Sequence, residues 1–479
     1  MPRTILMLVV LLGLGAYVYF VELPKAKQDT EKPTVLTFEK ESVDTLTLTY
    51  PEREISLQQT AVGEWNLTAP IQAKADDTAV NNMLTTLEDE EVTRSLTPQE
   101  PTDLALYGLA QPPVVVHLVL QDGTTLPKVS VGKDTPVGFS VYVQKEGDPQ
   151  LHLTRQAFRL GLTKHVKELR DKAVLPFERD SVTRIAIDTS ETSIVLAKTD
   201  AGWTFEHPAP YAVDASAIQT YLSTLEGIRA EDFVEQPLLD LSAFGLDPAQ
   251  LTVSLHLGED TKRTLSVGDE KSVDAGTTQR YLKRDNGETL YLVRAGLLKD
   301  LSKSVTDFRD KAVVSIPEGK ITQVVLTRQG GAGFTLSRGE ENAWEIDSKS
   351  EGTLKTATLS QFVTDLRELR GFEIAADNPE DLSPYGLDDP TITLVATDET
   401  GEKLATVFLG QTTQEETEKH FAMRAGGESV FTLRDYVFSR FDKNPEDFWE
   451  KPEPETESAE ETPASEHRAG ADVQEELLE

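Results

Sequence analysis

The sequence predicts an α+β fold of three homologous modules behind an N-terminal transmembrane helix, each module a mixed, mainly antiparallel sheet with about two helices. A tryptophan that follows a strand-like run recurs at intervals of 138 and 141 positions, as Trp65, Trp203 and Trp344. An aromatic-Gly-Leu motif recurs at 137 and 141 positions, as Tyr107-Gly108, Phe244-Gly245 and Tyr385-Gly386. A period this long is the size of a domain rather than of a solenoid unit, so the chain is triplicated.

A third marker, Arg170-Asp171-Lys172, returns as Arg309-Asp310-Lys311 near the end of the next module. At 479 residues the chain is long enough for about three domains of common size, each with its own core. The predicted organisation is a transmembrane anchor at 1–23, a linker at 24–35, repeat modules at 36–175, 176–314 and 315–449, and a disordered acidic tail at 450–479.

The anchor is predicted from residues 5–21, which carry no charge and are just long enough to cross a bilayer as a helix. Arg3 on the short N-terminal side favours an orientation that places everything after Pro24 outside the membrane. The alternative is a signal peptide cleaved at the small residues 13–16, which would release a soluble exported protein. We prefer the uncleaved anchor because Tyr17 and the residues after it extend the apolar run past that site.

Within module 2, alternating apolar residues predict three short antiparallel strands around 182–187, 194–196 and 203–205. A helix follows, capped by Asp214. Its apolar residues have the i, i+3, i+4, i+7 spacing that places them on one face. The same face is predicted in each module: Val80, Met83, Leu84 and Leu87; Ile218, Tyr221, Leu222 and Leu225; Leu359, Phe362, Val363 and Leu366. Asp76 is the expected cap in module 1, and Thr356 in module 3.

After the aromatic-Gly-Leu motif, four more strands are predicted in module 2, at 251–257, 263–267, 279–283 and 290–293. The last two are joined by Asp285-Asn286-Gly287, a hairpin signal because Asn and Gly tolerate positive φ. A single closing helix is expected from Gly296 to Lys311, with the Arg-Asp-Lys marker as a cation-rich last turn. Module 3 differs there, with Asp442-Lys443-Asn444.

Composition excludes several functions. The formal net charge of −35 argues against nucleic acid as a partner, because a polyanion would be repelled. The chain has no cysteine, which excludes disulfides, thiolate metal sites and cysteine nucleophiles. The acidic tail from Glu450 has too little apolar content to form a core, which predicts disorder.

A search for catalytic motifs assigns no catalytic, cofactor-binding or metal-binding residue. Gly132-Lys133 resembles the end of a phosphate-binding loop, but Pro127 stands in place of the first loop glycine and Asp134 in place of the magnesium-binding hydroxyl residue. His117 and His256 occupy matching strand positions without neighbours at metal-ligand spacing. The sequence therefore predicts that the protein is not an enzyme and uses no cofactor.

The aromatic-Gly-Leu motif is the most conspicuous local feature. Each copy follows an Asp-Leu pair by a few residues, which predicts a helical turn ended by a glycine in the left-handed conformation. The alternative is an aromatic platform for a sugar or peptide, repeated three times. The tryptophans are expected in strands, packed against the helix face.

Taken together, these motifs resemble a bacterial family, the domain of unknown function DUF4340. The resemblance rests on the membrane helix, the Trp strand, the Asp-capped helix, the turn at Tyr385-Gly386-Leu387-Asp388-Asp389-Pro390, the strand ending in Val-Gly and the closing Leu-Arg-Asp-Lys segment. It extends from Met1 to about Trp449, and module 1 departs from it at Gly108-Leu109-Ala110-Gln111, which lacks the aspartate. Similarity to this family implies an envelope accessory role beside an ABC-type transport system related to gliding-motility components.

The expected function is therefore that of a non-enzymatic scaffold or adaptor. It would be anchored as a single-pass protein in the bacterial inner membrane, with the bulk of the chain in the periplasm. Its expected partners are membrane proteins, including the permease or ATPase of an ABC transporter. The alternative is an exported glycan-binding protein or envelope enzyme with a cleft between modules. A polar pocket present in one module and absent from the others would favour that alternative.

Overall fold

The computed structural model describes residues 33–60, 64–97, 103–208, 211–234, 240–258, 260–274, 276–331, 333–339, 343–348, 350, 352–413 and 418–450. The predicted anchor at 1–23, nearly all of the linker at 24–35 and the tail after Glu450 lie outside these residues. None of the helices in the described ranges is long and apolar enough to span a membrane. The chain divides into two compact units, one formed by residues up to 210 with 216–303, the other by 211–215 with 304 onward.

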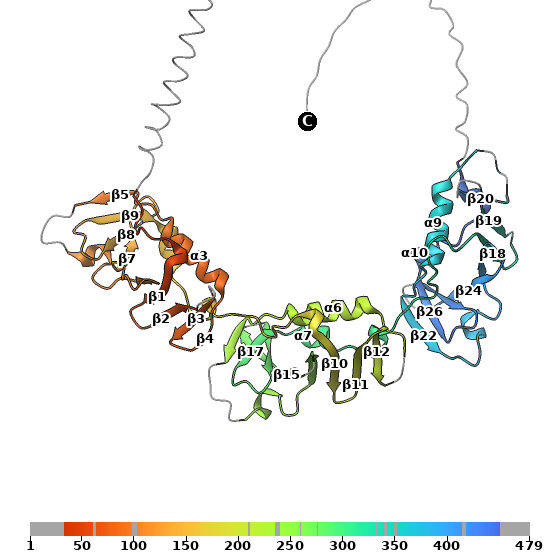
Figure 1. Cartoon of the computed structure of the whole chain (residues 1–479), viewed down its shortest axis with the longest axis horizontal. Coiled ribbons are helices and arrows are strands. Elements are labelled where there is room, and N and C mark those ends of the chain that lie inside the picture. Colours follow the sequence, from red (N-terminus) through yellow and green to blue (C-terminus); the bar gives the residue numbers. More distant parts are fainter. Residues whose placement is uncertain are drawn as a thin grey trace, which may run out of the picture. The chain divides into compact units, whose positions relative to one another are not determined.

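The first sheet has nine strands in the order β4-β3-β2-β1-β6-β7-β8-β9-β5 (Figure 1). Its strands are β1 (Val43–Thr49), β2 (Glu54–Gln59), β3 (Trp65–Ala69), β4 (Ala73–Lys74), β5 (Arg94–Leu96), β6 (Val114–Leu120), β7 (Val129–Asp134), β8 (Ser140–Lys145) and β9 (Leu151–Arg155). Its helices are η2 (Lys40–Ser42), α3 (Asp77–Glu88), η3 (Leu104–Tyr107), α4 (Gln156–Leu162) and α5 (Val166–Leu169).

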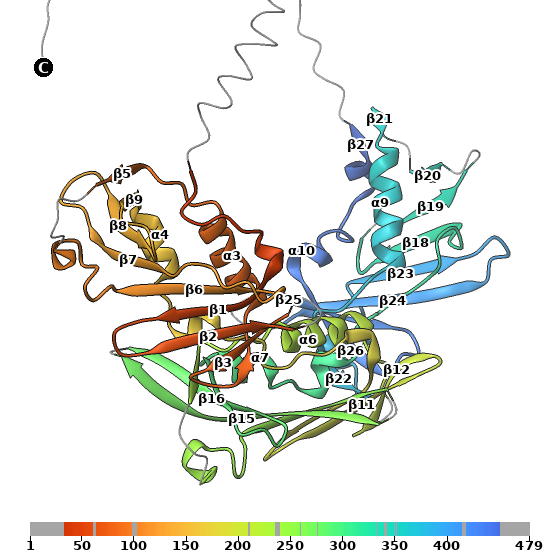
Figure 2. The same ribbon diagram turned by 60° about the vertical axis from the view of Figure 1, so that its left-hand side comes forward.

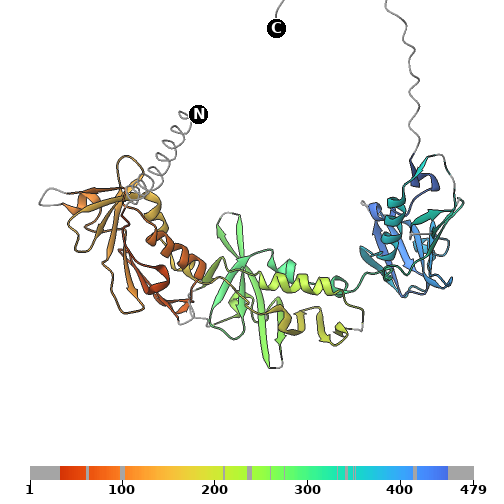
Figure 3. The ribbon, with the colours of Figure 1, turned by 45° about the horizontal axis from the view of Figure 1, so that its top comes forward.

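The second sheet, in the same unit, has eight strands in the order β12-β11-β10-β14-β15-β16-β17-β13. Its strands are β10 (Val182–Thr189), β11 (Ser193–Thr199), β12 (Gly202–His207), β13 (Asp232–Val234), β14 (Leu251–Leu257), β15 (Thr261–Asp274), β16 (Thr277–Arg284) and β17 (Leu290–Arg294). Its helices are η4 (Arg179–Ser181), α6 (Ala215–Glu226), η5 (Ser242–Phe244) and α7 (Leu297–Leu301), and the next helix in the chain, α8 (Val305–Phe308), belongs to the second unit. Helix α6, yellow-green in Figure 3, lies along one face of this sheet.

The third sheet belongs to the second unit and has the order β20-β19-β18-β23-β24-β25-β26-β22. Its strands are β18 (Gln323–Arg328), β19 (Phe334–Arg338), β20 (Trp344–Ile346), β22 (Glu373–Asp377), β23 (Ile392–Thr397), β24 (Lys403–Thr412), β25 (Lys419–Arg424) and β26 (Ser429–Arg434). Its helices are α9 (Thr356–Arg367), η7 (Ser383–Tyr385), α10 (Asp435–Phe438) and η8 (Pro445–Phe448). A separate two-stranded ribbon pairs β21 (Thr353–Leu354) with β27 (Trp449–Glu450) beside the start of α9 (Figure 2).

The three sheets share one topology, which confirms the repeated architecture. In each, a strand that follows the long helix crosses to the far edge and pairs with the last strand, as β13 pairs with β17. All strand pairs in the described ranges are antiparallel, which confirms the expectation of mainly antiparallel sheets, and only the expected admixture of parallel pairs was wrong. Each sheet lies within one of the predicted module ranges, and the module boundaries themselves stay predictions.

The long helices bury the predicted faces. The four apolar residues expected on each helix are the buried ones in α3, α6 and α9. Asp76 caps α3, accepting the Ala79 N–H at 3.0 Å. The cap predicted for α9 was wrong, because Lys355 occupies that position and Thr356 already belongs to the helix. The Lys355 N–H donates to the Phe448 carbonyl at 2.8 Å, so pairing with a distant segment fixes where the helix starts.

Two further expectations were wrong in detail. The single closing helix of module 2 is two short helices, α7 and α8, and Ser304 caps the second through a reciprocal hydrogen bond with Asp307. The hairpin between β16 and β17 takes its positive φ at Asp285, at 48°, rather than at the Asn-Gly pair. Both differences are local choices of backbone path that leave the strand pairing as predicted.

Candidate interaction surface

The aromatic-Gly-Leu motifs form the same turn in all three modules. Gly108, Gly245 and Gly386 end short 3₁₀ helices with φ of 68°, 65° and 62°, the left-handed conformation that the sequence predicts. The preceding aspartates shape the turn, since Asp240 and Asp381 each accept a backbone N–H two residues ahead at 2.9 Å.

The strand glycines Gly132, Gly268 and Gly410 explain where these turns dock. A Cβ atom at these positions would lie 2.3, 2.2 and 2.1 Å from the carbonyl oxygen of the motif's aromatic residue. Each glycine sits in a β-bulge, where the register of β7, β15 or β24 shifts against its neighbour. These are therefore close-packing glycines within bulged strands rather than strand-end glycines.

The motif's aromatic rings also have matching partners. Tyr107 packs edge-on against Tyr142, Phe244 against Tyr281 and Tyr385 against Phe421, with ring centroids 4.9, 4.9 and 5.1 Å apart. Edge-to-face packing at this distance stabilises the fold. The rings are thus engaged by their own sheets, which supports a structural role over a ligand platform.

The repeated tryptophans are less uniform. Trp65 is fully buried in the first core, which also contains the α3 face, and Trp344 is buried with the α9 face. Trp203 is only half-buried, and Phe205 two residues later is buried instead. Side chains two apart share a strand face, so one large residue can take the place of the other.

The Arg-Asp-Lys marker lies beyond the closing helix, and the prediction of a last helical turn was wrong. Arg170 and Arg309 follow α5 and α8 with extended backbone, at ψ of 139° and 141°. Arg170 places its guanidinium 3.9 Å from the Phe233 ring centroid and donates to the Thr289 hydroxyl at 3.2 Å. The arginine therefore joins the end of the first module to the edge of the second sheet.

Backbone pairing reinforces this connection within the first unit. The Asp171 N–H donates to Lys74 O at 2.9 Å, and the Ala230 N–H donates to Lys172 O at 2.8 Å. Arg284 donates to Val174 O at 3.0 Å. The segment 170–174 is thus hydrogen-bonded both to the module before it and to the module after it.

The second unit contains the corresponding contacts around Arg309. Its guanidinium binds Asp377 through two hydrogen bonds of 2.6 and 2.8 Å, donates to Ser429 at 3.1 Å and lies 4.0 Å from the Tyr211 ring centroid. These bonds lower the pKa of Asp377 from its usual value and raise that of Arg309. Thr289 directly precedes β17, and Ser429 is the first residue of β26. Arg170 and Arg309 therefore donate to hydroxyl groups at equivalent positions of their sheets.

In module 3 the structural counterpart of the marker is Trp449-Glu450, rather than Asp442-Lys443-Asn444. Trp449 directly follows the short helix η8, as Arg170 follows α5 and Arg309 follows α8. In η8 the capping box is formed by Asn444 and Asp447. Leu354 pairs with Trp449 as Ala75 pairs with Arg170. Trp449 therefore stands where modules 1 and 2 have the joining arginine.

Module 1 contains a serine, a histidine and an aspartate in hydrogen-bond reach. His152 Nδ1 lies 3.1 Å from Ser95 Oγ, and Nε2 lies 3.0 Å from Asp148 Oδ2. In serine hydrolases Nε2 faces the serine and Nδ1 the aspartate, so the nitrogen order here is reversed. Ser95 and His152 are direct cross-strand partners in β5 and β9, and neither lines a described cavity. The arrangement is that of a cross-strand polar contact.

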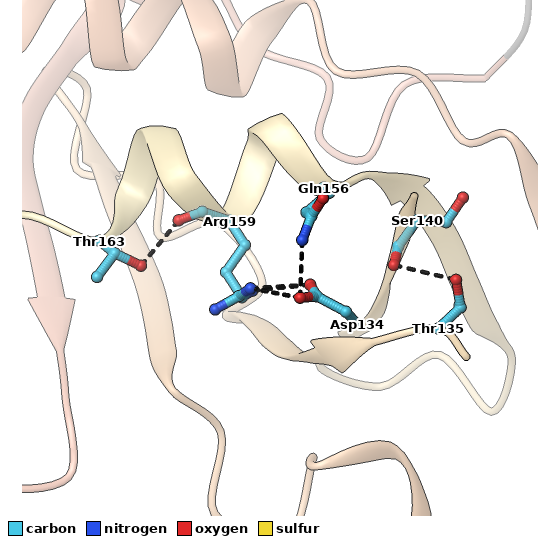
Figure 4. A network of polar contacts seen from close by, with 6 residues as sticks. All are labelled: Asp134, Thr135, Ser140, Gln156, Arg159 and Thr163. Carbon is cyan, nitrogen blue, oxygen red and sulfur yellow. Dashed lines mark hydrogen bonds and ion pairs between the residues drawn. The ribbon is translucent and has the colours of Figure 1, made fainter. Parts of the chain in front are cut away.

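A second polar network joins the bulged strand of module 1 to its closing helix. Figure 4 shows Asp134 between Arg159 and Gln156. Arg159 donates three hydrogen bonds to Asp134, at 3.2, 2.9 and 2.7 Å, and Gln156 donates one at 2.8 Å. In module 2, Arg280 instead binds Glu270 and the Gly268 carbonyl. In module 3, His420 stacks on Phe438 at 3.6 Å. The modules thus keep their turns while their polar contacts diverge.

Metal and histidine chemistry finds no support in these ranges: no group of three His, Cys, Asp or Glu side chains among the described residues is placed to hold a metal ion. His117 and His256 lie on β6 and β14 as predicted. Burial, together with the positive charges of Arg184 and Lys262, lowers the pKa of His256.

The candidate functional surface is a groove in the second unit, between α9 and the segment that begins with α10. Two adjoining cavities of about 420 and 470 Å³ share Gln361, Asp365, Tyr436 and Arg440. Phe362 and Phe448 line its apolar part, and Tyr436 is 57% exposed at its edge. We call this the α9 groove.

The α9 groove is cationic in an acidic chain. Its charged lining residues are Arg370, Arg434, Arg440, Lys443, Asp365 and Glu368, which is two more cations than acids. Arg440 donates to Asp365 at 2.9 Å, and the Arg434 guanidinium lies 3.9 Å from the Phe372 ring. Exposed aromatic rings with arginine are typical of protein interfaces. Sequence reasoning missed this surface, because its residues come from two segments about 70 positions apart.

A smaller cavity of about 230 Å³ occupies the matching place in module 2, lined by Arg229, Arg294 and Leu297 among others. Arg229 and Arg294 correspond to Arg370 and Arg434. Tyr436 and Arg440 are replaced by Gly296 and Asp300. Modules 2 and 3 therefore have a cavity at the same place, and the cavities of module 3 are larger and lined by additional aromatic and basic side chains.

The fold and these contacts define a repeat protein of antiparallel α+β modules. The family model described as "Domain of unknown function (DUF4340)" matches residues 65–238, 203–375 and 344–459. The chain belongs to the DUF4340 family. Each match begins at one of the repeated tryptophans, and the first two run into the following module, so the family unit includes the joining segment. No curated protein and no solved structure matches the chain.

Proposed function

We propose that the protein is a non-enzymatic scaffold or adaptor. It is anchored in the bacterial inner membrane through residues 5–21, projects its modules into the periplasm and binds membrane proteins. The permease or ATPase of an ABC transporter is the partner that the family resemblance suggests. The α9 groove is the surface we assign to the partner.

One observation carries the proposal: both copies of the Arg-Asp-Lys marker fix their own joining segments by packing and hydrogen bonds. The segment 170–174 is hydrogen-bonded on both sides, and Arg309 contacts three partners within the second unit. A spacer needs fixed joining segments, whereas the polar side chains on its modules are free to differ from one module to the next. An enzyme would instead need convergent reactive groups in a cavity, as in known active sites.

A co-purification experiment tests this function. The tagged full-length protein is crosslinked in its native membrane, purified in mild detergent, and its companions are identified by mass spectrometry. We expect a transporter permease or ATPase at near-stoichiometric level. Recovery of the protein alone from membranes where it is abundant would contradict a stable adaptor.

A pair of charge-reversal variants tests the assigned surface. The groove variant combines Arg434→Glu with Lys443→Glu and reverses two positive charges of the α9 groove. The control variant combines Arg184→Glu with Lys198→Glu and reverses two positive charges on the second sheet. We expect the groove variant to lower partner recovery about tenfold, as reversed charges at an interface do, and the control to leave it unchanged. Equal effects of both variants would show that net charge, and not the groove, controls binding.

A second candidate function rests on one cavity of about 670 Å³ in module 1, lined by polar residues that include Lys40, Asp44, Asn81 and Gln121. A polar pocket in one module favours glycan binding. Among the residues that the structure describes, no aromatic side chain lines it, so its described lining lacks the stacking platform that sugars use. Binding of envelope glycan fragments, lost on Asn81→Ala with Gln121→Ala, would support this candidate.

A further inference from the structure

The α9 groove lies next to the point where the described chain ends. Phe448 lines the groove, and the last described residue, Glu450, pairs with Thr353 just before α9. Another 29 residues follow, 451–479. They contain ten acidic residues against Lys451 and Arg468, so their charge is opposite to that of the groove.

We propose that the C-terminal segment Asp472–Glu479 of the same chain binds in the α9 groove. This segment combines three apolar residues, Val473, Leu477 and Leu478, with four acids, Asp472, Glu475, Glu476 and Glu479. The groove offers matching features in the exposed rings of Phe372 and Tyr436 and the cations Arg434, Arg440 and Lys443. No other stretch of the last 29 residues has apolar side chains beside its acids in this density.

The tether has a suitable length. Residues 451–471 form a connection of 21 residues, and a random coil of this length has a root-mean-square span of about 25 Å. From Thr358 to Arg367 the groove follows α9 for about 14 Å, at 1.5 Å per helical residue. The segment can therefore turn back from Glu450 and reach every part of the groove. A tether matched to the span gives an effective concentration in the millimolar range, so even weak contacts fill the site.

Binding of the segment would occupy the groove that we assign to the partner. In this respect the inference rests on the proposed function, since the segment and an acidic partner would compete for one groove. The contact itself requires no partner. It is tested on the protein alone, and its failure would leave the co-purification result standing.

The absence of cysteine in the chain provides a clean test by disulfide formation. Ser439→Cys places a thiol on the exposed rim of the groove, and Gln474→Cys places one in the segment. The matched control joins Gln474→Cys to Glu399→Cys, an exposed turn residue between β23 and β24. Both pairs are made in the full-length protein in membrane vesicles, and intramolecular disulfide formation under mild oxidation is followed on non-reducing gels.

We expect the groove pair to form its disulfide about tenfold or more faster than the control pair, because a tethered binder raises the local concentration only where it docks. Two double variants of the segment should slow disulfide formation in the groove pair to the rate of the control pair without affecting the fold. They are Leu477→Asp with Leu478→Asp, and Glu475→Lys with Glu476→Lys. Equal rates for the two pairs, or a groove rate that both segment variants leave unchanged, would overturn the proposal. Disulfides mainly between two chains would also overturn it, and would assign the groove to the segment of a second copy.

Discussion

Replacing Arg309 tests the idea that the Arg-Asp-Lys marker holds the joining segment in place. The Arg309 side chain is 9% exposed and makes two hydrogen bonds to Asp377, one to Ser429 and a ring contact with Tyr211. A hydrogen bond to a charged group contributes roughly 1.5–3 kcal/mol, and a partly desolvated cation–π contact about 1 kcal/mol. Asp377 is 36% exposed and remains solvated when the arginine is removed, which limits the loss. We therefore expect Arg309→Ala to cost about 2.5 kcal/mol of local stability.

Hydrogen exchange measures this loss where it occurs. The Gly371 N–H donates to Lys311 O at 2.7 Å, and the Asp310 N–H to Ala212 O at 2.8 Å. A local loss of about 2.5 kcal/mol corresponds to exchange about 60-fold faster in peptides covering these amides. A double-mutant cycle with Asp377→Asn should show coupling of about 1.5 kcal/mol, since both changes remove the same bonds.

Arg184→Ala is the matched control. Arg184 pairs with Glu206 at 2.8 Å, but both side chains are largely exposed, so the loss should be below about 0.5 kcal/mol. Exchange in the 309–313 peptide that stays within about threefold of wild type after Arg309→Ala would refute the reasoning, because the joining segment would then be held by backbone bonds alone.

Three further outcomes are expected. Gly410→Ala should destabilise the second unit by about 3 kcal/mol in urea unfolding, because its Cβ would lie 2.1 Å from the Tyr385 carbonyl oxygen. Tyr221→Phe should cost about 1 kcal/mol by the same measurement, since it removes the 3.2 Å bond to the buried Leu301 carbonyl. His256 has a lowered pKa in the folded state, so its contribution to stability is present above about pH 6.5 and declines as the pH falls through the folded pKa. His256→Gln should flatten the pH dependence of the unfolding midpoint below pH 6.5.

Controls separate these effects from general damage. Gly401 has a φ of +81°, but a Cβ atom added there would have no neighbour within 4 Å. Gly401→Ala should therefore cost only about 1 kcal/mol, from the left-handed backbone conformation alone. A cost equal to that of Gly410→Ala would contradict the close-approach argument. A Tyr221→Phe variant as stable as wild type would mean that water satisfies the Leu301 carbonyl. An unchanged pH profile for His256→Gln would assign the acid sensitivity to other groups.

The sequence determined the number and order of the modules, because three markers keep one spacing. It also determined the helix faces, such as Leu359, Phe362, Val363 and Leu366, since a local period of 3.6 residues fixes which side chains share a side. The left-handed glycines at 108, 245 and 386 followed from local turn chemistry as well.

Tertiary structure decided what the markers do. Nothing near Arg309 in sequence predicts Asp377 as its partner, because 68 positions separate them and the contact depends on how β22 and β26 meet the joining segment. The glycine at 410 is required by the Tyr385 carbonyl, which reaches it only through a bulge. The α9 groove likewise arises from residues 358–372 and 434–448. Local patterns encode local conformation, whereas contacts between distant segments are set by the packing of the whole sheet.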